Sequence, residues 1–245
     1  MEIPEYKNMY HNERSHYFYV ATHQLVLSLI RHYLPKQQRN LKILDAGCGT
    51  GLLAKKMQQF GSVKGIDFSN EALRFARKRK IAVKKALIEK IPFKSKNFDV
   101  VVSIDVLTHS SIKNDLVPLK EFSRVLKPNG ILILRVAAHP WLKLIHDVHV
   151  HVNHRYEKGE LAAKLIKAGF KIEKLSYIHS VLLPPIIVKH FWEKLLKPKK
   201  TLSAVAKTHL WLNWLLIQLL LIEVKFFTKL NFPFGLGLVS VGRKT

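Results

Sequence analysis

The segment that most constrains the fold is "LKILDAGCGTGLLAKKM", residues 41–57. An apolar run typical of a buried strand is followed by three glycines in five positions and then by apolar residues at helical spacing. Glycines after a first strand bring bare backbone close to a ligand, and the next helix presents free N–H groups to it. The segment therefore predicts a strand, a turn and a helix that bind a ligand at the turn.

The spacing of these glycines separates the nucleotide-binding folds. Gly47, Gly49 and Gly51 form GxGxG, whereas a dinucleotide fingerprint GxGxxG needs its third glycine at Leu52. No GK[ST] follows, which excludes a P-loop. Asp45 stands two residues before the first glycine, where a carboxylate would repel a pyrophosphate and attract an ammonium group. The pattern favours a ligand with a cationic amino-acid end and a nucleoside end.

Apolar strands and helices alternate over the first 140 or so residues. Strands are expected at 41–46, 63–66, 81–88, 98–104 and 131–137, and helices at 13–34, 50–60, 69–80 and 112–126, the last stopped by the turn signal "KPNG". Further along we expect a helix at 157–168, a strand at 170–177, apolar segments at 185–196 and 202–227, and a final strand at about 236–241. Strands this apolar are buried on both faces, which predicts a doubly wound, mainly parallel sheet.

Charge and cysteine content set outer limits on function. The formal net charge is +24, which attracts nucleic acid, anionic lipid or anionic substrates, or else reflects lysines on solvated faces. The densest cluster, "RFARKRKIAVKK" at 74–85, has one aromatic residue and so lacks the stacking residues of a single-strand binder. Cys48 is the only cysteine, so no internal disulfide is expected. With no secretory signal pattern at the N-terminus, we expect a cytoplasmic protein.

The stretch "LDAGCGTG", residues 44–51, resembles motif I of the class I S-adenosylmethionine-dependent methyltransferases. The resemblance implies that S-adenosylmethionine is the cofactor and that Asp45 contacts its methionyl amino group, with the backbone at Gly47, Gly49 and Gly51 close by. It also implies an acid at the end of the second strand that accepts the ribose hydroxyls. Asp67 in "GIDFS" stands there.

Adenine recognition departs from the pattern of that family. Phe68 would cover one face of the adenine. The family's loop "DAEKLPF" reads "LIEKIPF" at 87–93, so Leu87 replaces the acid that usually meets the adenine amino group, and the backbone of Ile88 is left to contribute. "FDVVVSIDVLTH", "FSRVLKPNGILIL" and "GLGLVSVGRK" match in kind. The fold implied is a Rossmann-like, seven-stranded sheet whose last strand is antiparallel.

Two further segments are similar to a methyltransferase type 11 subgroup related to ubiquinone biosynthesis. They are "NERSHYFYVATHQLVLSLI" and "HDVHVHVNHRYEKGELAAKLIKAGF". The resemblance covers the whole chain and implies a single methyltransferase domain, 1–245. We divide it into an N-terminal helical cap (1–40), a cofactor-binding core (41–138), a substrate-side segment (139–183), an apolar helical insertion (184–234) and the final strand (235–245).

The histidine-rich segment offers candidate acceptor contacts. His146, His154, Arg155 and Tyr156 lie in the part that resembles the subgroup's substrate side. Arg155 and Tyr156 would anchor an anionic or aromatic acceptor, or else tie the active-site cap together. A histidine cluster also invites a metal, but no cysteine accompanies it, and we predict none.

His109 and Asp105 follow the fourth strand, close to where the methyl group would be presented. His109 could take a proton from an oxygen or nitrogen acceptor. Because a sulfonium is already activated, methyl transfer needs chiefly positioning. His109 and Asp105 are therefore candidate bases if the reaction uses one, a point the sequence leaves open, and His109 is otherwise a capping or packing residue.

The apolar insertion raises the question of a membrane. "LWLNWLLIQLLLI", residues 210–222, is shorter than the roughly 20 residues of a spanning helix. Asn213, Gln218 and Glu223 interrupt or end it. Two amphipathic helices with lysine stripes would lie on an anionic membrane surface through residues 184–230, cap the sheet edge, or form a homodimer interface.

Three functions remain open at this point. The leading one is an S-adenosylmethionine-dependent methyltransferase acting on a small-molecule or lipid-linked acceptor, in the cytoplasm and peripherally on a membrane. The net charge motivates an RNA (tRNA) methyltransferase instead, although no appended RNA-binding motif is found. A non-catalytic membrane-binding or scaffold module is supported only by Leu87.

Overall fold

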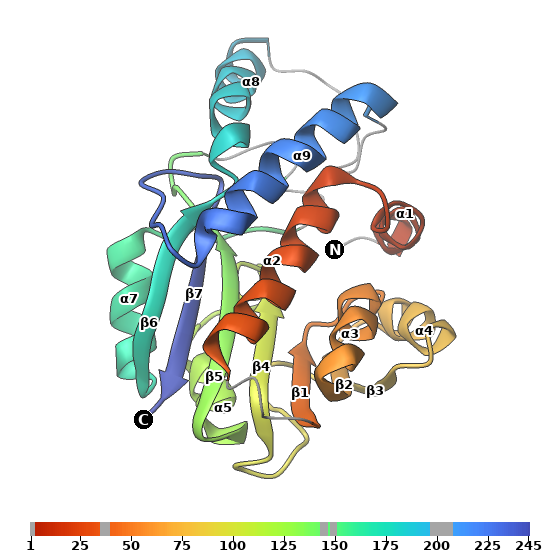
Figure 1. Ribbon diagram of the computed structural model, residues 1–245, viewed down its shortest axis with the longest axis vertical. Coiled ribbons are helices and arrows are strands. Elements are labelled where there is room, and N and C mark those ends of the chain that lie inside the picture. The colour runs from red at the N-terminus through yellow and green to blue at the C-terminus, as the bar shows by residue number, and fades with distance from the viewer. Residues whose placement is uncertain (1–2, 35–39, 143–146, 148–150, 197–207) are drawn as a thin grey trace.

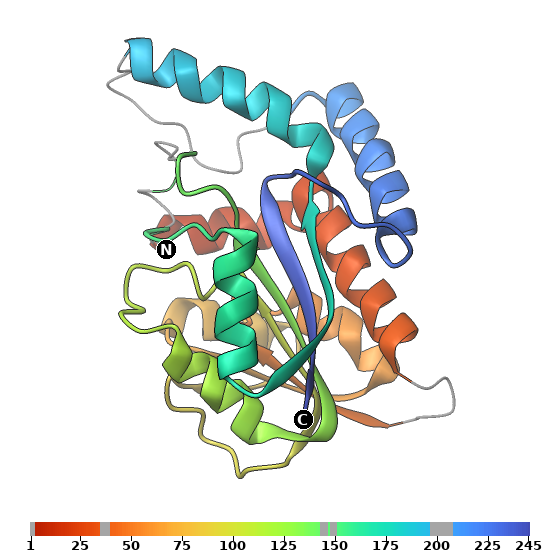
Figure 2. The same ribbon diagram turned by 90° about the vertical axis from the view of Figure 1, so that its left-hand side faces the viewer.

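The computed structural model describes residues 3–34, 40–142, 147, 151–196 and 208–245. Its centre is a seven-stranded sheet in the order β3-β2-β1-β4-β5-β7-β6, with helices on both faces (Figures 1 and 2). The strands are β1 Leu41–Ala46, β2 Gly61–Asp67, β3 Ala82–Lys85, β4 Phe98–Ile104, β5 Leu126–Ala137, β6 Phe170–Ile178 and β7 Gly237–Lys244. The helices are α1 Ile3–Asn12, α2 Tyr17–Tyr33, α3 Leu52–Met57, α4 Asn70–Lys78, α5 Leu116–Val125, α7 Lys158–Lys167, α8 Leu183–Leu196 and α9 Leu210–Phe227, with short 3-10 turns η1 Gln58–Phe60 and η2 Ser180–Leu182.

Strand pairing confirms the predicted sheet. β1 pairs in parallel with β2 on one side and with β4 on the other, and β3 and β5 extend the parallel part. β7 runs antiparallel between β5 and β6, as expected for the final strand. The strand order reverses between β1 and β4, and in such sheets ligands bind beyond the carboxyl ends of the strands at this reversal.

Two apolar clusters hold the layers together. Phe122 of α5 and Leu161 of α7 are fully buried against one face of the sheet. Leu25 of α2, Met57 of α3 and Phe227 of α9 are buried against the other face. Burying a large apolar side chain contributes roughly 1.5–3 kcal/mol. The two clusters hold the sheet between its helices. Because β1 to β5 are parallel, their carboxyl ends then lie together at one edge of the sheet.

Several elements differ from the sequence-based expectation; among them, α2 begins at Tyr17 and α5 at Leu116, each four residues after its expected start. β5 begins at Leu126, which pairs with Phe98, so "KPNG" lies inside the strand instead of ending a helix in a turn. The register shifts between Phe98 and Val100, and Asn129 has a φ of 62°, so the strand absorbs the bend that the turn residues impose. β3 ends at Lys85, three residues before its expected end. Helix α1 was not expected, because Tyr6 is its only buried residue and its apolar pattern is weak.

The insertion between β6 and β7 forms helices α8 and α9, and α9 lies along α2 (Figure 1). Asn213 of α9 accepts a hydrogen bond from the backbone N–H of Tyr17 at 3.0 Å, and its amide donates to the carbonyl of Ser15 at 2.8 Å. Glu223 accepts from the backbone N–H and the hydroxyl of Ser180 at 3.0 and 2.9 Å. The polar residues of this apolar segment therefore attach α9 to the rest of the protein.

Candidate functional site

Three acidic side chains gather where β1 and β2 end. Asp45, near the end of β1, is 2% exposed, and its Oδ2 has no hydrogen-bond partner among the described residues. Burial, together with the nearby Asp67 and Glu13 carboxylates, raises the pKa of Asp45 to about 7. Burial also raises the pKa values of Asp67 and Glu13. A chain of net charge +24 thus contains a buried cluster of acidic side chains, which suits a cationic ligand group.

The glycine turn holds Asp67 in place. The N–H groups of Gly47 and Cys48 donate to the carbonyl of Ile66 at 2.8 and 2.9 Å, and the N–H of Gly49 donates to Asp67 Oδ2 at 2.9 Å. Gly47 has a φ of +87°, and a Cβ there would lie 2.1 Å from Val106 Cγ2, so no other residue fits. Each carboxylate oxygen can accept more than one hydrogen bond, which leaves Asp67 capacity for ligand hydroxyls.

Helix α1 and the residues after it cover this turn (Figure 1). A Cβ on Gly49 would lie 3.5 Å from Met9 Cε, so α1 comes within contact distance of the glycines. Glu13 is buried and bonds to the Thr50 hydroxyl at 2.5 Å and to Arg79 at 2.5 Å. Sequence reasoning missed α1 and Glu13. The signal for α1 was the helical spacing of Tyr6 and Tyr10 before the expected helix, whereas Glu13 had been placed at the start of that helix.

The predicted adenine contacts lie beside Asp67. Phe68 is 44% exposed, and its ring centroid is 5.6 Å from that of His109. The side chain of Ile88 is in the core, so only its backbone can face a ligand. Leu87 is exposed. Phe68 is therefore available to cover an aromatic base, and the assignments of Phe68 and Ile88 stay predictions.

His109 is a half-buried ring between Phe68 and His151. Burial lowers its pKa to about 4, so it is neutral at pH 7. Its Nδ1 accepts a hydrogen bond from the backbone N–H of Ser111 at 3.2 Å and lies 2.9 Å from the Ser111 hydroxyl. This contact assigns the ring proton to Nε2, which then donates and cannot take up a proton. The geometry favours a positioning role, and the catalytic role remains a prediction.

A second polar cluster lies at the carboxyl ends of β4 and β5. Asp105 has a φ of 59° and forms an ion pair with Arg135, which is 4% exposed. Arg135 Nη2 is 3.3 Å from His179 Nδ1, and the guanidinium lies 4.7 Å from the ring centroid of Phe18. Arg135 Nε, Asp105 Oδ1 and His179 Nε2 have no hydrogen-bond partners within the part of the chain that the structure describes. Sequence reasoning missed Arg135, whose signal was a single cation in the apolar strand "ILILRVA".

Comparison with known proteins assigns this arrangement to a family. Residues 44–134 match the family model described as a methyltransferase domain. A ubiquinone biosynthesis O-methyltransferase from Pelagibacter ubique is 32% identical over 183 residues, which cover 71% of this chain and 63% of that protein. Residues 44–134 are therefore a methyltransferase domain, of the class that uses S-adenosylmethionine.

Other proteins to which this chain is similar have different names, and some are much longer than the segment that matches. A probable tRNA methyltransferase 9B from Homo sapiens is 34% identical over 110 residues, which cover 44% of this chain and 24% of that protein. The match thus spans about a quarter of that relative's length. Among solved structures, a possible histamine N-methyltransferase from Thermotoga maritima superposes with a TM-score of 0.62 at 20% identity, covering 99% of this chain and 96% of that one. A putative methyltransferase in complex with the Haloferax volcanii Trm112 activator gives 0.61 at 17% identity, covering 98% and 93%. Both structures show the same fold.

The side chains predicted to contact the acceptor of the methyltransferase are bound to other parts of the protein. Arg155 donates two hydrogen bonds to Asp147, at 2.9 and 2.8 Å, and a third to the carbonyl of Ala138 at 3.0 Å. Tyr156 is buried and donates to Asp115 at 2.7 Å, and burial raises its pKa. These contacts favour the alternative that both residues tie the cap to the sheet. His146 lies outside the described residues.

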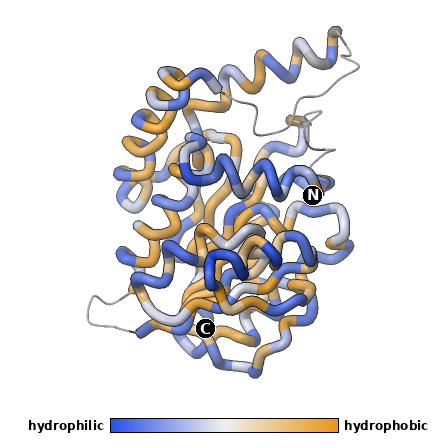
Figure 3. The backbone as a smooth tube through the Cα atoms, turned by 90° about the vertical axis from the view of Figure 1, so that its right-hand side faces the viewer, coloured by the Kyte–Doolittle hydropathy of each residue, from blue (hydrophilic) through white to orange (hydrophobic). Residues whose placement is uncertain are grey.

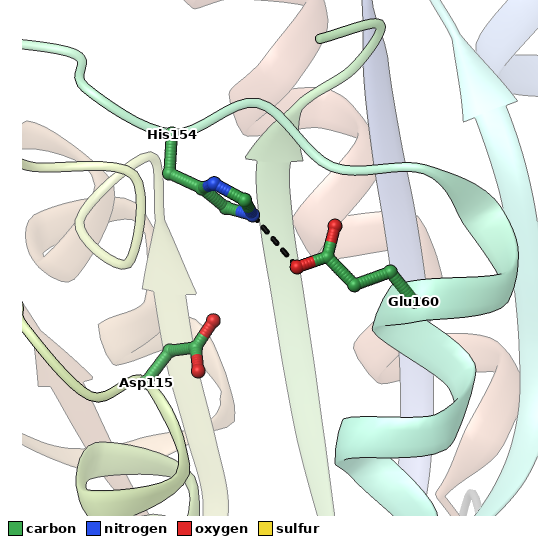
Figure 4. A group of neighbouring side chains, drawn as sticks. All are labelled: Asp115, His154 and Glu160. Carbon is green, nitrogen blue, oxygen red and sulfur yellow. Dashed lines mark hydrogen bonds and ion pairs between the residues drawn. The ribbon is translucent and has the colours of Figure 1, made fainter.

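His154 belongs to a charged cluster on the surface, together with Asp115 and Glu160 (Figure 4). His154 Nε2 is 2.8 Å from Glu160 Oε1. The cluster has the composition of a metal site, but Lys164 Nζ lies 2.5 Å from Asp115 and 2.7 Å from Glu160. The lysine ammonium forms ion pairs with both carboxylates. A network of ion pairs accounts for the cluster.

The residues that motif I contributes fit S-adenosylmethionine. Asp45 is a buried carboxylate with one oxygen lacking a partner in the described structure, which suits the methionyl ammonium. Asp67 is held at the end of β2 by backbone N–H groups and can accept two ribose hydroxyls. Gly47 and Gly49 add no side chain to the turn beside these carboxylates. The two carboxylates stand at the ends of the adjacent parallel strands β1 and β2, and their roles at the two ends of that ligand stay a prediction.

Proposed function

We propose that the protein transfers the methyl group of S-adenosylmethionine to a small-molecule or lipid-linked acceptor. The observation that carries the proposal is the buried Asp45 carboxylate beneath the glycine turn, with an oxygen that lacks a partner in the described chain. In this proposal Asp45 holds the methionyl ammonium and Asp67 holds the ribose. The bound cofactor supplies a methyl group that its positively charged sulfur already activates.

The Arg135, Asp105 and His179 cluster would orient the acceptor. It lies at the ends of β4 and β5, next to the cofactor side of the sheet reversal. Asp105 Oδ1 would accept a hydrogen bond from the acceptor, and Arg135 Nε would donate one, because neither atom has a partner in the described structure. In this arrangement Asp105 and Arg135 would hold the acceptor, and the bound cofactor would supply the methyl group and leave as S-adenosylhomocysteine.

The names of two relatives support a small or lipid-linked acceptor. One is the Pelagibacter ubique enzyme of ubiquinone biosynthesis, and another is a demethylmenaquinone methyltransferase from Staphylococcus aureus, 30% identical over 121 residues. The exposed apolar surface of α8 and α9 near the acceptor side suits a hydrophobic acceptor better than RNA.

A tRNA acceptor is the second candidate, favoured by the net charge and by the relatives named tRNA methyltransferase. The basic cluster at 74–85 lies on α4 and on β3, the edge strand of the sheet, and β2 and β1 separate it from β4. Arg79 is buried against Glu13, and Arg74 is paired with Glu71, so these two charges are partly neutralised. RNA that bound to this cluster would therefore lie away from the acceptor side.

Calorimetric titration with S-adenosylhomocysteine tests the cofactor site. We expect binding by the wild type and a loss of at least about tenfold in Asp67→Ala, since two ligand hydroxyls lose a charged acceptor. Asp99→Asn is the control. Asp99 is about as buried as Asp67, but it lies near the start of β4, where it pairs with Lys127 of β5. No binding by the folded wild type would end the proposal. Incubating cell extract with methyl-labelled cofactor then separates the acceptors: label in the organic phase supports a lipid-linked acceptor, and label in tRNA supports the second candidate.

A further inference from the structure

All four tryptophans of the chain are exposed at one end of the molecule. Trp141, Trp192, Trp211 and Trp214 expose between 52% and 68% of their surface. The rings of Trp141 and His190 are 6.3 Å apart, which places Trp141 beside α8, while Trp192 is on α8 itself and the other two are on α9. Tryptophan is normally buried for most of its area, so four exposed rings at one end of the molecule need an explanation.

Exposed aliphatic and phenyl side chains continue this surface. Phe191 and Leu195 of α8 are 61% and 79% exposed, and Figure 3 shows hydrophobic positions along both helices at this end. We name the set of Trp141, Phe191, Trp192, Leu195, Trp211 and Trp214 the tryptophan surface. Six large apolar side chains exposed at one end differ from the scattered single apolar residues that any protein surface carries.

We propose that the tryptophan surface docks the protein on the face of an anionic lipid bilayer. Lys189 and Lys194 on α8 and Lys225 on α9 are exposed on the same two helices, and the exposed Lys229 follows the end of α9. Tryptophan and lysine together are typical of segments at the membrane interface, where the ring meets the acyl boundary and the ammonium meets lipid phosphates. Interfaces between proteins are depleted in lysine, which makes a second copy or a protein partner a poorer fit.

The contacts that α9 makes with the rest of the protein argue for a helix that lies along the bilayer surface and against a membrane span. By length and composition α9 could span a membrane, but 22% of it is buried. Leu220, Val224 and Phe227 pack into the protein, and Asn213 and Glu223 are hydrogen-bonded to residues outside α9. Insertion across the bilayer would expose these polar groups to hydrocarbon, where each unsatisfied group costs several kcal/mol.

The surface lies at the same end of the molecule as the site. α8 begins directly after β6, at the edge where the parallel strands end, and this is also the edge of Asp45 and Asp105 (Figure 1). Docking would therefore turn the acceptor side toward the bilayer. That an acceptor enters from the lipid rests on the proposed function, whereas docking itself does not.

Tryptophan fluorescence and co-sedimentation with vesicles test the docking. We expect binding and a blue shift with vesicles that contain phosphatidylglycerol, and at least about tenfold weaker binding to phosphatidylcholine alone. The variant Trp192→Ser/Trp211→Ser/Trp214→Ser should lose about tenfold or more of the affinity. Ile166→Ser, 64% exposed on α7, is the matched control and should bind like wild type.

Three results would overturn the proposal. One is equal sedimentation of the wild type and the triple variant with anionic vesicles. Another is a dimer that the triple variant abolishes, without vesicle binding by the wild type. The third is quenching of the tryptophans by bromines at the bilayer centre as strong as by bromines near the headgroups. Titration of the triple variant with S-adenosylhomocysteine tests the cofactor site independently of vesicle binding, and we expect the affinity of the wild type.

Discussion

Asp45 is a carboxyl group that the fold buries at the expense of stability. Its pKa is raised to about 7, and one oxygen has no partner in the described structure. Between about pH 4 and pH 7 the folded state binds more protons than the unfolded state, so the free energy of unfolding falls as pH rises through this range. A ligand that brings an ammonium group reverses the penalty by favouring the ionised form.

Asp45→Asn should therefore stabilise the cofactor-free protein and weaken ligand binding. At about pH 8 we expect a gain of about 1–3 kcal/mol in the free energy of unfolding, shrinking toward zero near pH 4. Urea unfolding at several pH values measures the gain, and titration with S-adenosylhomocysteine measures the loss. A variant less stable than the wild type at about pH 8 would show that the carboxylate is satisfied in the free protein.

The same carboxyl group should make cofactor binding depend on pH. Below its pKa of about 7, Asp45 of the free protein is protonated and must release a proton to pair with an ammonium. The affinity for S-adenosylhomocysteine should fall by up to about tenfold per pH unit below pH 7 and level off above it. Calorimetry in buffers of different ionisation enthalpy would detect the released proton. Equal affinities at about pH 6 and pH 8 would contradict this assignment.

At the scale of elements, α2 begins with a cap from another helix. Asn213 of α9 accepts from the N–H of Tyr17 and donates to Ser15. Asn213→Ala should cost about 1–2 kcal/mol, the range measured for lost helix caps. Gln218→Ala on the exposed side of α9 is the control and should stay within about 0.5 kcal/mol of wild type in urea unfolding. Equal stabilities would show that apolar packing alone holds α9 on α2.

The sequence predicted elements whose pattern is strong and local. β1 and β4 match their expected bounds, and the motif I residues meet at the strand ends as expected, because parallel strands place their carboxyl ends at one edge. Three features depend on contacts made only in three dimensions: the cap on α2 from Asn213, the ion pair of Arg135 with Asp105, and the bidentate pair of Arg155 with Asp147. A sequence shows which residue stands at each of these positions, but it does not show which other residue its side chain contacts.

At the scale of the molecule, the positive charge forms two surfaces with different expected partners. One is the basic edge, where Arg77, Lys80 and Lys85 are exposed on or beside α4 and β3. The other is the pair of helices α8 and α9 with the tryptophan surface. Since β3 and the acceptor side are separated by β2 and β1, the two surfaces can be altered independently.

Arg77→Gln/Lys80→Gln/Lys85→Gln should separate nucleic-acid binding from methyl transfer. We expect wild-type protein to retain tRNA at low salt through phosphate contacts, and the variant to reduce the slope of log affinity against log salt by up to about 3. Vesicle binding and label in the organic phase should match wild type, because these residues lie at the far edge of the sheet. If the variant instead loses label from tRNA while vesicle binding persists, the basic edge delivers the acceptor and RNA is the substrate.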